Sequence, residues 1–261
     1  MLRALATAAA GMEAQQTRLD VTANNIANVS TGGFKKSRAE FADLMYQTMR
    51  PAGAPTGAGT TAPGALEVGL GVRVAGTQRM ESQGALQTTN NPLDVAIQGR
   101  GYFPVTLPSG ETAYTRNGAF QINSEGMLVT NEGYQVGDGI TLPTGAKTVT
   151  IAGDGTVSAT VEGDPEPQVL GQLQLATFVN PAGLEARGGT LFGATAASGE
   201  AIVGPPGSDG AGNLLQGSIE QSNVSVVEEM IDLISGQRAY EINSRVIKAA
   251  DEMLGQTASL R

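Results

Sequence analysis

Two amphipathic segments, one near each end of the chain, constrain the fold more than any other feature of this sequence. In the first, apolar and small residues recur at alternating spacings of three and four from residue 2 to residue 26. Its larger side chains are those of Leu2, Leu5, Met12, Leu19 and Ile26. Such heptad spacing is typical of helices that supercoil around a partner helix. We therefore expect a long helix that ends near residue 28 and packs this row against another helix.

The second amphipathic segment covers residues 225–260. Ser225 and Glu228 are spaced as a capping box, which predicts a helix that begins next to Ser225. This segment carries two apolar rows, whereas a solvent-facing helix needs only one. The first row comprises Val227, Ile231, Ile234, Ile242, Val246, Ala249, Met253 and Leu260, and the second comprises Val226, Met230, Leu233, Tyr240, Ile247 and Leu254. We expect one row to face the N-terminal helix and one to face further copies of the chain; burial in an ordinary globular core is the alternative.

The composition excludes several kinds of functional site. The 261 residues include no cysteine or histidine, so no disulfide, thiolate nucleophile or Cys/His metal site can form. Neither a phosphate-binding loop nor a complete dinucleotide-binding glycine motif is present. The net charge of −9 argues against nonspecific binding of nucleic acid, which requires clustered Lys and Arg. We therefore expect no enzymatic activity, no cofactor, no metal and no nucleic-acid partner.

The hydropathy of the chain also bears on membranes and export. No run of residues approaches the roughly 20 apolar positions of a membrane span, so we expect no membrane insertion. The first residues superficially resemble a signal peptide, but the amphipathic period continues past them to Ile26. A leader that is removed would not need this period, so we expect a helix that the mature protein retains.

The segment after the first helix is rich in Pro, Gly, Ala and Thr. Residues 34–50 fit either a short helix or an extended arm, and residues 51–71 contain prolines at positions 51, 55 and 63. We expect residues 51–71 to form no regular element, but a long loop or an arm that a neighbouring molecule orders.

The remaining middle of the chain carries β-sheet signals. Short runs of β-forming residues are separated by turn signals at residues 108–110 and 123–126, while residues 180–217 are loop-rich. This pattern predicts antiparallel sheets or a small barrel.

These patterns together predict an α+β fold, in which two long terminal helices pair as a coiled coil around central antiparallel β-domains. The predicted division has three parts. Residues 1–33 and 219–261 form a terminal helical core, residues 34–71 form an extended arm, and residues 72–218 form the central β-rich region.

Four motifs in sequence order resemble those of the bacterial flagellar axial proteins, which build the rod and the hook. They are LDVTANNIAN followed by TGGFK (residues 19–35), NNPLDVAIQGRGYF (90–103), YTRNGAF (114–120), and SNV, EM and QRAYEIN (222–243). The resemblance covers nearly the whole chain. It implies a structural subunit that polymerises into a hollow helical tube, with terminal helices inside and β-domains outside.

Within this family, the length and the stretch FADLMYQTMR (residues 41–50) are most similar to the distal rod branch. A proximal rod paralogue of similar length and a hook-type protein are the alternatives. The resemblance implies a location in the periplasm-spanning rod of the basal body and type III export without a cleaved signal peptide. It implies as partners further copies of the chain, proximal rod proteins, the hook protein, the P- and L-ring proteins and a rod cap. The arm around Tyr46, Pro51, Pro55 and Pro63 is expected to lie across a neighbouring subunit.

Two functions of other classes remain as alternatives at this stage. A secreted cell-wall hydrolase would need a glutamate with a raised pKa in a cleft, and the many carboxylates of this sequence show no such setting. A β-domain binding module on a coiled-coil stalk would form closed oligomers instead of open tubes.

Overall fold

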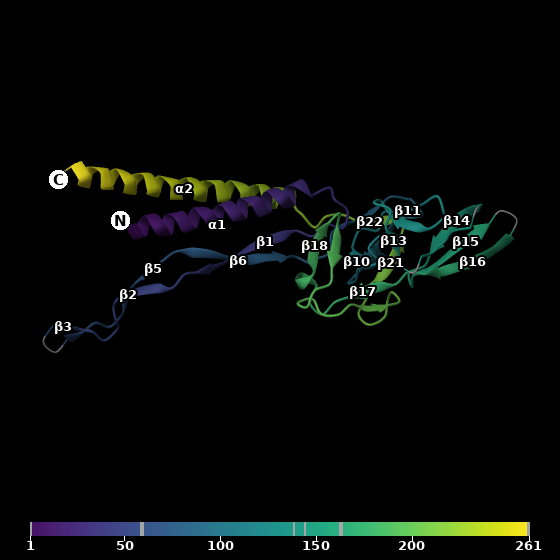
Figure 1. Cartoon of the computed structure of the whole chain (residues 1–261), viewed down its shortest axis with the longest axis horizontal. Coiled ribbons are helices and arrows are strands. Elements are labelled where there is room, and N and C mark those ends of the chain that lie inside the picture. The colour runs from purple at the N-terminus through teal and green to yellow at the C-terminus, as the bar shows by residue number, and fades with distance from the viewer. Residues whose placement is uncertain (1, 58–59, 138, 144, 162–163, 260–261) are drawn as a thin grey trace. The chain divides into compact units, whose positions relative to one another are not determined.

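The computed structural model describes residues 2–57, 60–137, 139–143, 145–161 and 164–259. The chain divides into two compact units, which we describe separately. The helical unit comprises Met1–Ala27, Ser37–Gln78 and Ser225–Arg261, and the β unit comprises Asn28–Lys36 and Arg79–Val224. The described residues combine helices with antiparallel strand pairs, which confirms the α+β class (Figure 1). The predicted three-part division stays a prediction.

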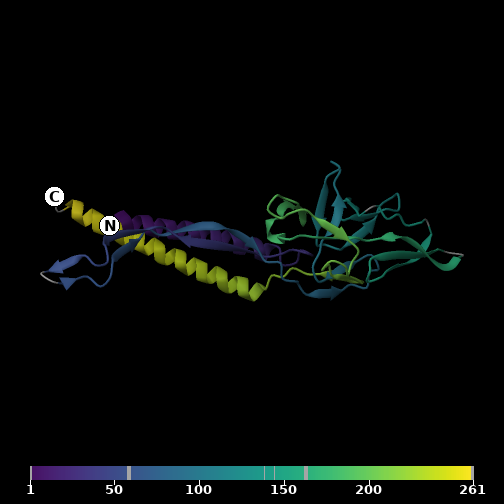
Figure 2. The same ribbon diagram turned by 90° about the horizontal axis from the view of Figure 1, so that it is seen from below.

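Two long helices, α1 (Leu2–Ala27) and α2 (Val226–Ser259), form most of the helical unit. The first ends where the sequence predicts, because the turn residues after position 28 break the apolar period. The second begins directly after Ser225, whose carbonyl accepts a hydrogen bond of 3.0 Å from the N–H of Glu229. The two helices contact each other and lie side by side in Figures 1 and 2.

The rest of the helical unit is a series of two-stranded antiparallel ladders. The pairs are β1 (Ser37–Asp43) with β6 (Val72–Arg79), β2 (Tyr46–Arg50) with β5 (Leu66–Gly69), and β3 (Pro55–Gly57) with β4 (Thr60–Thr61). Of the two structures expected for residues 34–50, the extended one is therefore correct. The expectation that residues 51–71 form no regular element is wrong, because β3, β4 and β5 lie there. A two-stranded ladder tolerates Pro55 because its outer edge needs no N–H donor, and Pro55 is the first residue of its strand.

The β unit is built around a seven-stranded antiparallel sheet. Its spatial order is β11 (Phe120–Ile122), β12 (Leu128–Thr130), β13 (Gln135–Val136), β9 (Phe103–Thr106), β10 (Thr112–Thr115), β19 (Leu191–Gly193) and β18 (Glu185–Gly188). A three-stranded sheet contains β14 (Ala146–Ile151), β15 (Thr156–Val161) and β16 (Asp164–Gln172). The remaining pairs are β17 (Leu175–Thr177) with β20 (Ile202–Gly204), β21 (Asn213–Gln216) with β8 (Val95–Gln98), and β22 (Ser218–Glu220) with β7 (Leu86–Thr88). A short 3-10 helix, η1, covers Pro181–Gly183.

Both predicted hairpin turns are confirmed. Gly110 ends the turn between β9 and β10, and Gly126 ends the turn between β11 and β12. Both glycines have positive φ angles, of 83° and 82°, which other residues rarely adopt. The expectation of a loop-rich stretch at residues 180–217 is wrong in part. Strands β18 to β21 lie there, and three-residue strands such as β19 are too short for periodicity to reveal.

The hydrophobic core of the β unit lies among these sheets. Phe103 and Phe120 are fully buried and meet edge to face, with their ring centroids 5.0 Å apart. Three consecutive residues of β8, from Val95 to Ile97, are all buried. This strand is therefore covered on both faces, and the period-two pattern of its sequence does not separate an inner face from an outer one.

Candidate assembly surfaces and the buried motif network

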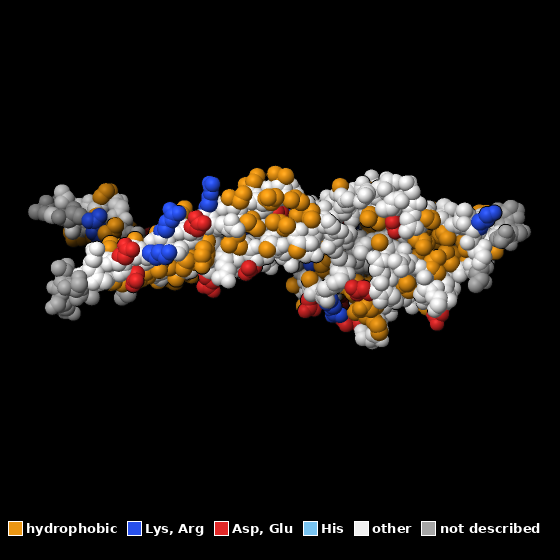
Figure 3. Space-filling model, turned by 90° about the horizontal axis from the view of Figure 1, so that it is seen from above, with side chains coloured by type: hydrophobic (Ala, Val, Ile, Leu, Met, Phe, Trp, Pro, Cys, Tyr) orange, Lys and Arg blue, Asp and Glu red, His pale blue; other side chains and the backbone are white. Residues whose placement is uncertain are grey.

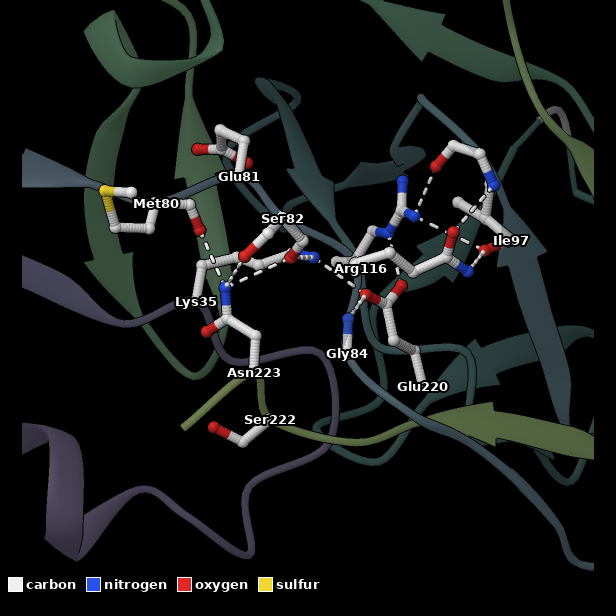
Figure 4. Close-up of polar contacts among 12 residues, drawn as sticks. Lys35, Met80, Glu81, Ser82, Gly84, Ile97, Arg116, Glu220, Ser222 and Asn223 are labelled. Carbon is white, nitrogen blue, oxygen red and sulfur yellow. Dashed lines mark hydrogen bonds and ion pairs between the residues drawn. The ribbon is translucent and has the colours of Figure 1, made fainter. Parts of the chain in front are cut away.

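Three charged side chains form a buried ion-pair network in the β unit. The Glu220 carboxylate accepts from Lys35 Nζ at 2.7 Å through one oxygen and from Arg116 Nε at 2.6 Å through the other (Figure 4). The exposed fractions of these side chains are 1 % for Glu220, 2 % for Lys35 and 5 % for Arg116. Because isolated buried charges are costly, both ends of this carboxylate must be paired for the fold to tolerate it.

Backbone groups provide further hydrogen-bond partners for the three charged side chains. The Arg116 guanidinium donates to the carbonyl oxygens of Gly99 and Gly101, both in the second sequence motif. Lys35 Nζ donates to the carbonyl of Ser82 at 2.8 Å, and the N–H of Gly84 donates to Glu220 at 2.9 Å.

The two cationic side chains change the pKa of the Glu220 carboxyl between them. Burial by itself would raise the pKa of Glu220, but Arg116 and Lys35 together hold the pKa of this carboxyl below its ordinary value. Burial lowers the pKa of Lys35, and its pairing with Glu220 offsets this lowering only in part. At neutral pH the arrangement therefore favours an ionised Glu220.

Asn223, in the fourth motif, connects the backbone next to Lys35 with the segment that contains Met80 and Ser82. Its side-chain oxygen accepts from the N–H of Lys36 at 2.7 Å. Its amide nitrogen donates to the carbonyl oxygens of Met80, at 2.8 Å, and of Ser82, at 3.0 Å (Figure 4). The network thus joins residues from all four motifs, and it gives the motifs a structural role in the β unit.

No sequence pattern indicated a role for Lys35 or Arg116, although both lie in the family motifs, and none distinguished Glu220. One signal was available for Glu220: it occupies an inward-facing position in β22, two residues after the buried Ser218. A charge at such a position requires a buried partner.

A second buried polar residue of the motifs lies in the helical unit. Asn25, which is 2 % exposed, exchanges two hydrogen bonds with the backbone of Ser37, at 2.8 Å and 3.0 Å. The same side chain donates to Glu229 of α2 at 3.0 Å. Asn25 thus connects the end of α1, the start of β1 and the first turns of α2.

The residues most deeply buried in the two helices are small or polar. They are Ala8, Ala14, Thr22 and Asn25 in α1, and Glu229, Gly236 and Ala250 in α2. The predicted N-terminal seam is only half-buried: Leu5, Met12, Leu19 and Ile26 share this intermediate exposure, and the side chain of Leu2 lies outside the described part. In the second predicted row of α2, Leu233, Ile247 and Leu254 are half-buried, whereas Met230 and Tyr240 are exposed.

The described members of the first predicted row of α2 are all exposed, and Leu260 lies outside the described residues. Val227, Ile231 and Ile242 expose 69 %, 62 % and 60 % of their surface, and Ile234, Val246 and Met253 are also exposed. Figure 3 shows hydrophobic side chains gathered along the helical part of the chain. Exposed apolar surface of this kind is typical of interaction sites.

The arm exposes apolar side chains as well. Tyr46, Met49 and Leu66 on β2 and β5 are exposed, as is Met45 just before β2. Pro51, Pro55 and Pro63 are exposed too. The arm contacts its own α1 near the N-terminus, where an Arg3 guanidinium nitrogen lies 3.3 Å from the sulfur of Met49.

The described residues bring together no group of three side chains suited to hold a metal ion. Neither described helix combines the length and apolar character of a membrane span.

Comparison with known proteins identifies the family. Models of flagellar axial proteins match three parts of the chain: a basal body rod protein model at residues 5–35, the D1 domain of the hook protein FlgE/F/G group at 96–159, and the C-terminal model of the FlgEFG rod proteins at 215–260. The flagellar basal-body rod protein FlgG of Caulobacter vibrioides is 51 % identical over 261 residues, which is 100 % of both chains. The FlgG protein of Borreliella burgdorferi is 50 % identical over 263 residues, which covers 100 % of this chain and 99 % of the relative.

The chain belongs to the FlgG family of flagellar basal-body rod proteins. The hook-type alternative is not favoured. The hook protein FlgE of Helicobacter mustelae is 46 % identical over 137 residues, which is 52 % of this chain and 30 % of that protein. Membership of the FlgG family gives the function in outline: a structural subunit of the distal rod in the flagellar basal body, and not an enzyme.

Proposed function

We propose that this FlgG-family chain polymerises into a hollow helical rod through the apolar rows of its terminal helices. The main support for this proposal is the exposed apolar row on α2, which consists of Val227, Ile231, Ile234, Ile242, Val246 and Met253. Every copy of the chain bears the same row, so a contact that does not close on itself produces an open helical filament. Torsional stiffness then comes from many such interlocked contacts between neighbouring subunits.

The half-buried row on α1 supports the same proposal. Leu5, Met12, Leu19 and Ile26 keep part of their surface accessible in the single chain. We propose that α1 and α2 pair as a coiled coil within one subunit, and that neighbouring subunits cover what remains exposed. In this arrangement the terminal helices form the inner part of the rod, and residues 72–218 face outward.

The test places a charge in the exposed row. Ile231→Asp puts a carboxylate at a position that polymerisation would bury, at a cost of several kcal/mol per contact. We expect export at wild-type levels, an unchanged melting transition of the β unit, and loss of completed rods in isolated basal bodies viewed by electron microscopy. The control is Lys248→Asp, an exposed polar position of α2 outside the row. Completed rods in Ile231→Asp, or their equal loss in both variants, would contradict the proposal.

We also propose that the arm at residues 46–63 lies across a neighbouring subunit and stiffens the rod. Exposed Tyr46 and Met49 supply apolar surface for that contact. The fixed φ angles of Pro51, Pro55 and Pro63 reduce the entropy that the arm loses when it is ordered. Deleting residues 46–63 should leave export and polymerisation intact but yield rods that bend, which electron micrographs can measure as curvature. Deletion rods as straight as wild type would indicate a passive surface loop.

The family resemblance also implies specific partners for the assembled rod. The ends of the rod would meet proximal rod proteins and the hook protein, its outer surface would meet the P- and L-ring proteins, and its growing tip would meet a cap. Export through the flagellar type III apparatus would deliver the subunit to the periplasm. The absence of cysteine suits assembly in an oxidising compartment, because no stray disulfide can form.

A further inference from the structure

Two glycines inside the long helices lie against side chains of the opposite helix. A methyl group added at Gly236 of α2 would lie 3.0 Å from Leu19 Cδ2 and 3.4 Å from Leu19 Cγ. A methyl group at Gly11 of α1 would lie 3.0 Å from Asn243 Nδ2. Carbon atoms at van der Waals contact are about 3.5–4.0 Å apart. Each glycine therefore provides a hole that a residue of the other helix fills, once in each direction.

Conformation does not explain these glycines. Neither is among the described residues with positive φ, so alanine could adopt the same backbone angles and would favour the helix. Gly255, also in α2, is different, because a methyl group added there would have nothing within 4 Å among the described residues. The close approach of Leu19 therefore sets Gly236 apart from a glycine of the same helix that lacks a neighbour.

Polar contacts fix the same antiparallel alignment at other points of the seam. Arg18 lies 2.6 Å from Asp232, and Asn25 lies 3.0 Å from Glu229. Along α2, Glu229, Gly236, Asn243 and Ala250 recur every seven residues. The first three contact α1 through Asn25, Leu19 and Gly11, and Ala250 is buried. Small and polar residues lie at these contacts with α1, while the apolar row of Val227, Ile231 and Ile242 lies on an exposed face of α2.

We propose that Gly236 and Gly11 are positioning residues that set the register of α1 against α2, and thereby orient the exposed apolar row of α2 for polymerisation. Both contacts have the same closest approach of 3.0 Å, but the Leu19 contact is between carbon atoms of a branched apolar side chain, whereas Asn243 approaches with the end of a polar one. A shift by one helical turn would place Leu19 against a residue with a side chain. The proposal rests on the polymerisation proposed above, because it explains how that surface is oriented.

The experiment is a double-mutant cycle in the full-length subunit expressed in flagellated cells. The variants are Gly236→Ala, Leu19→Ala, the double variant, and the matched control Gly255→Ala. Completed rods are counted by electron microscopy at equal amounts of exported subunit. We expect Gly236→Ala to lose most completed rods and Gly255→Ala to retain them. In the Leu19→Ala background, Gly236→Ala should cause no further loss of rods, because the shortened side chain at position 19 no longer reaches the space above Gly236.

A second readout reports the register directly. The chain has no cysteine, so Arg18→Cys and Asp232→Cys introduce the only thiols, at positions whose native side chains meet. A short bifunctional thiol reagent should link these positions within one chain of the exported subunit, and Gly236→Ala should reduce the yield per exported subunit while Gly255→Ala does not.

Wild-type rod counts and unchanged cross-linking in Gly236→Ala would overturn the register proposal, as would an equal effect of Gly236→Ala with and without Leu19→Ala. The polymerisation proposal is tested independently of the register, because it is contradicted if the Ile231→Asp variant still polymerises. The analogous pair, Gly11→Ala with Asn243→Ala, should show the same pattern with a smaller loss, because the end of an asparagine side chain can move aside.

Discussion

The helical unit and the β unit bury different kinds of residue. Among the described residues of the helical unit, the buried hydrophobic side chains are all alanines, at positions 8, 14, 62 and 250. The β unit buries large side chains such as Phe103, Phe120 and Leu175 almost completely. Most of the large exposed hydrophobic residues, including Ile231 and Ile242, belong instead to the helical unit.

This difference indicates two separate tasks. The β unit removes its apolar surface from water within one chain, and that burial is the main favourable contribution to folding. The helical unit leaves large apolar side chains accessible, and under the proposed function these are buried by contacts with other chains. Both properties agree with the proposed polymerisation, in which the β unit folds within one chain and the exposed apolar row of α2 is buried on assembly.

The difference between the two units can be tested by shortening one side chain in each. Phe103→Ala removes a fully buried ring that contacts Phe120 and should destabilise the β unit by about 3–5 kcal/mol. Ile231→Ala removes an exposed side chain and should change the stability of the isolated subunit by less than about 0.5 kcal/mol while weakening polymerisation. Urea denaturation followed by circular dichroism, together with rod counts, measures both effects. Similar stability losses in the two variants would show that the units do not differ as described.

The ion-pair network offers a test of similar size within the β unit. Glu220→Gln keeps the shape of the side chain but leaves Lys35 and Arg116 as uncompensated buried charges. Removing one partner of a buried pair typically costs about 3–5 kcal/mol, so we expect a loss of this size at pH 7. The control Glu111→Gln breaks the exposed pair with Arg187 and should leave the denaturation midpoint nearly unchanged.

The same network predicts a dependence on pH. The pKa of Glu220 is lower in the folded protein than its ordinary value of 4.5. The unfolded chain therefore binds the proton more readily, and the stabilisation by this carboxylate is complete above pH 4.5 and is lost as pH falls through the folded pKa. Wild-type stability should fall below pH 4.5 more steeply than that of Glu220→Gln. Parallel curves for the two proteins would mean that Glu220 gains nothing from its partners.

The smallest effect concerns a polar atom in the helical unit. The Oε1 atom of Gln15 is buried and has no hydrogen-bond partner among the described residues. Gln15→Met replaces it with an apolar side chain of similar length and should stabilise the helix pair by about 1 kcal/mol. Thermal unfolding followed by helical circular dichroism compares it with Gln16→Met, an exposed neighbour. A loss of stability specific to Gln15→Met would show that this oxygen is satisfied in solution.

Much of the local structure could be predicted from the sequence, because it depends on residues close together in the chain. The end of α1 at Ala27 and the start of α2 after Ser225 follow from turn and capping residues. The hairpins closed by Gly110 and Gly126 follow from the backbone freedom of glycine. The motifs were sufficient to indicate the family. The two apolar rows on one helix indicated more apolar surface than the chain buries itself, and one row is exposed, whereas its role in assembly stays a prediction.

Tertiary structure alone decided which helix faces meet and which charges are buried. Hydrophobic periodicity predicted a seam through Leu5, Met12 and Leu19, whereas the deepest positions belong to alanines and polar residues beside that row. Periodicity reports where apolar side chains lie, but a close contact between helices depends on the absence of a side chain at Gly236. Likewise, Lys35, Arg116 and Glu220 read as surface charges until the chain brings them together. Their burial is tolerated only because Glu220 pairs with both Lys35 and Arg116, which come from separate segments of the chain.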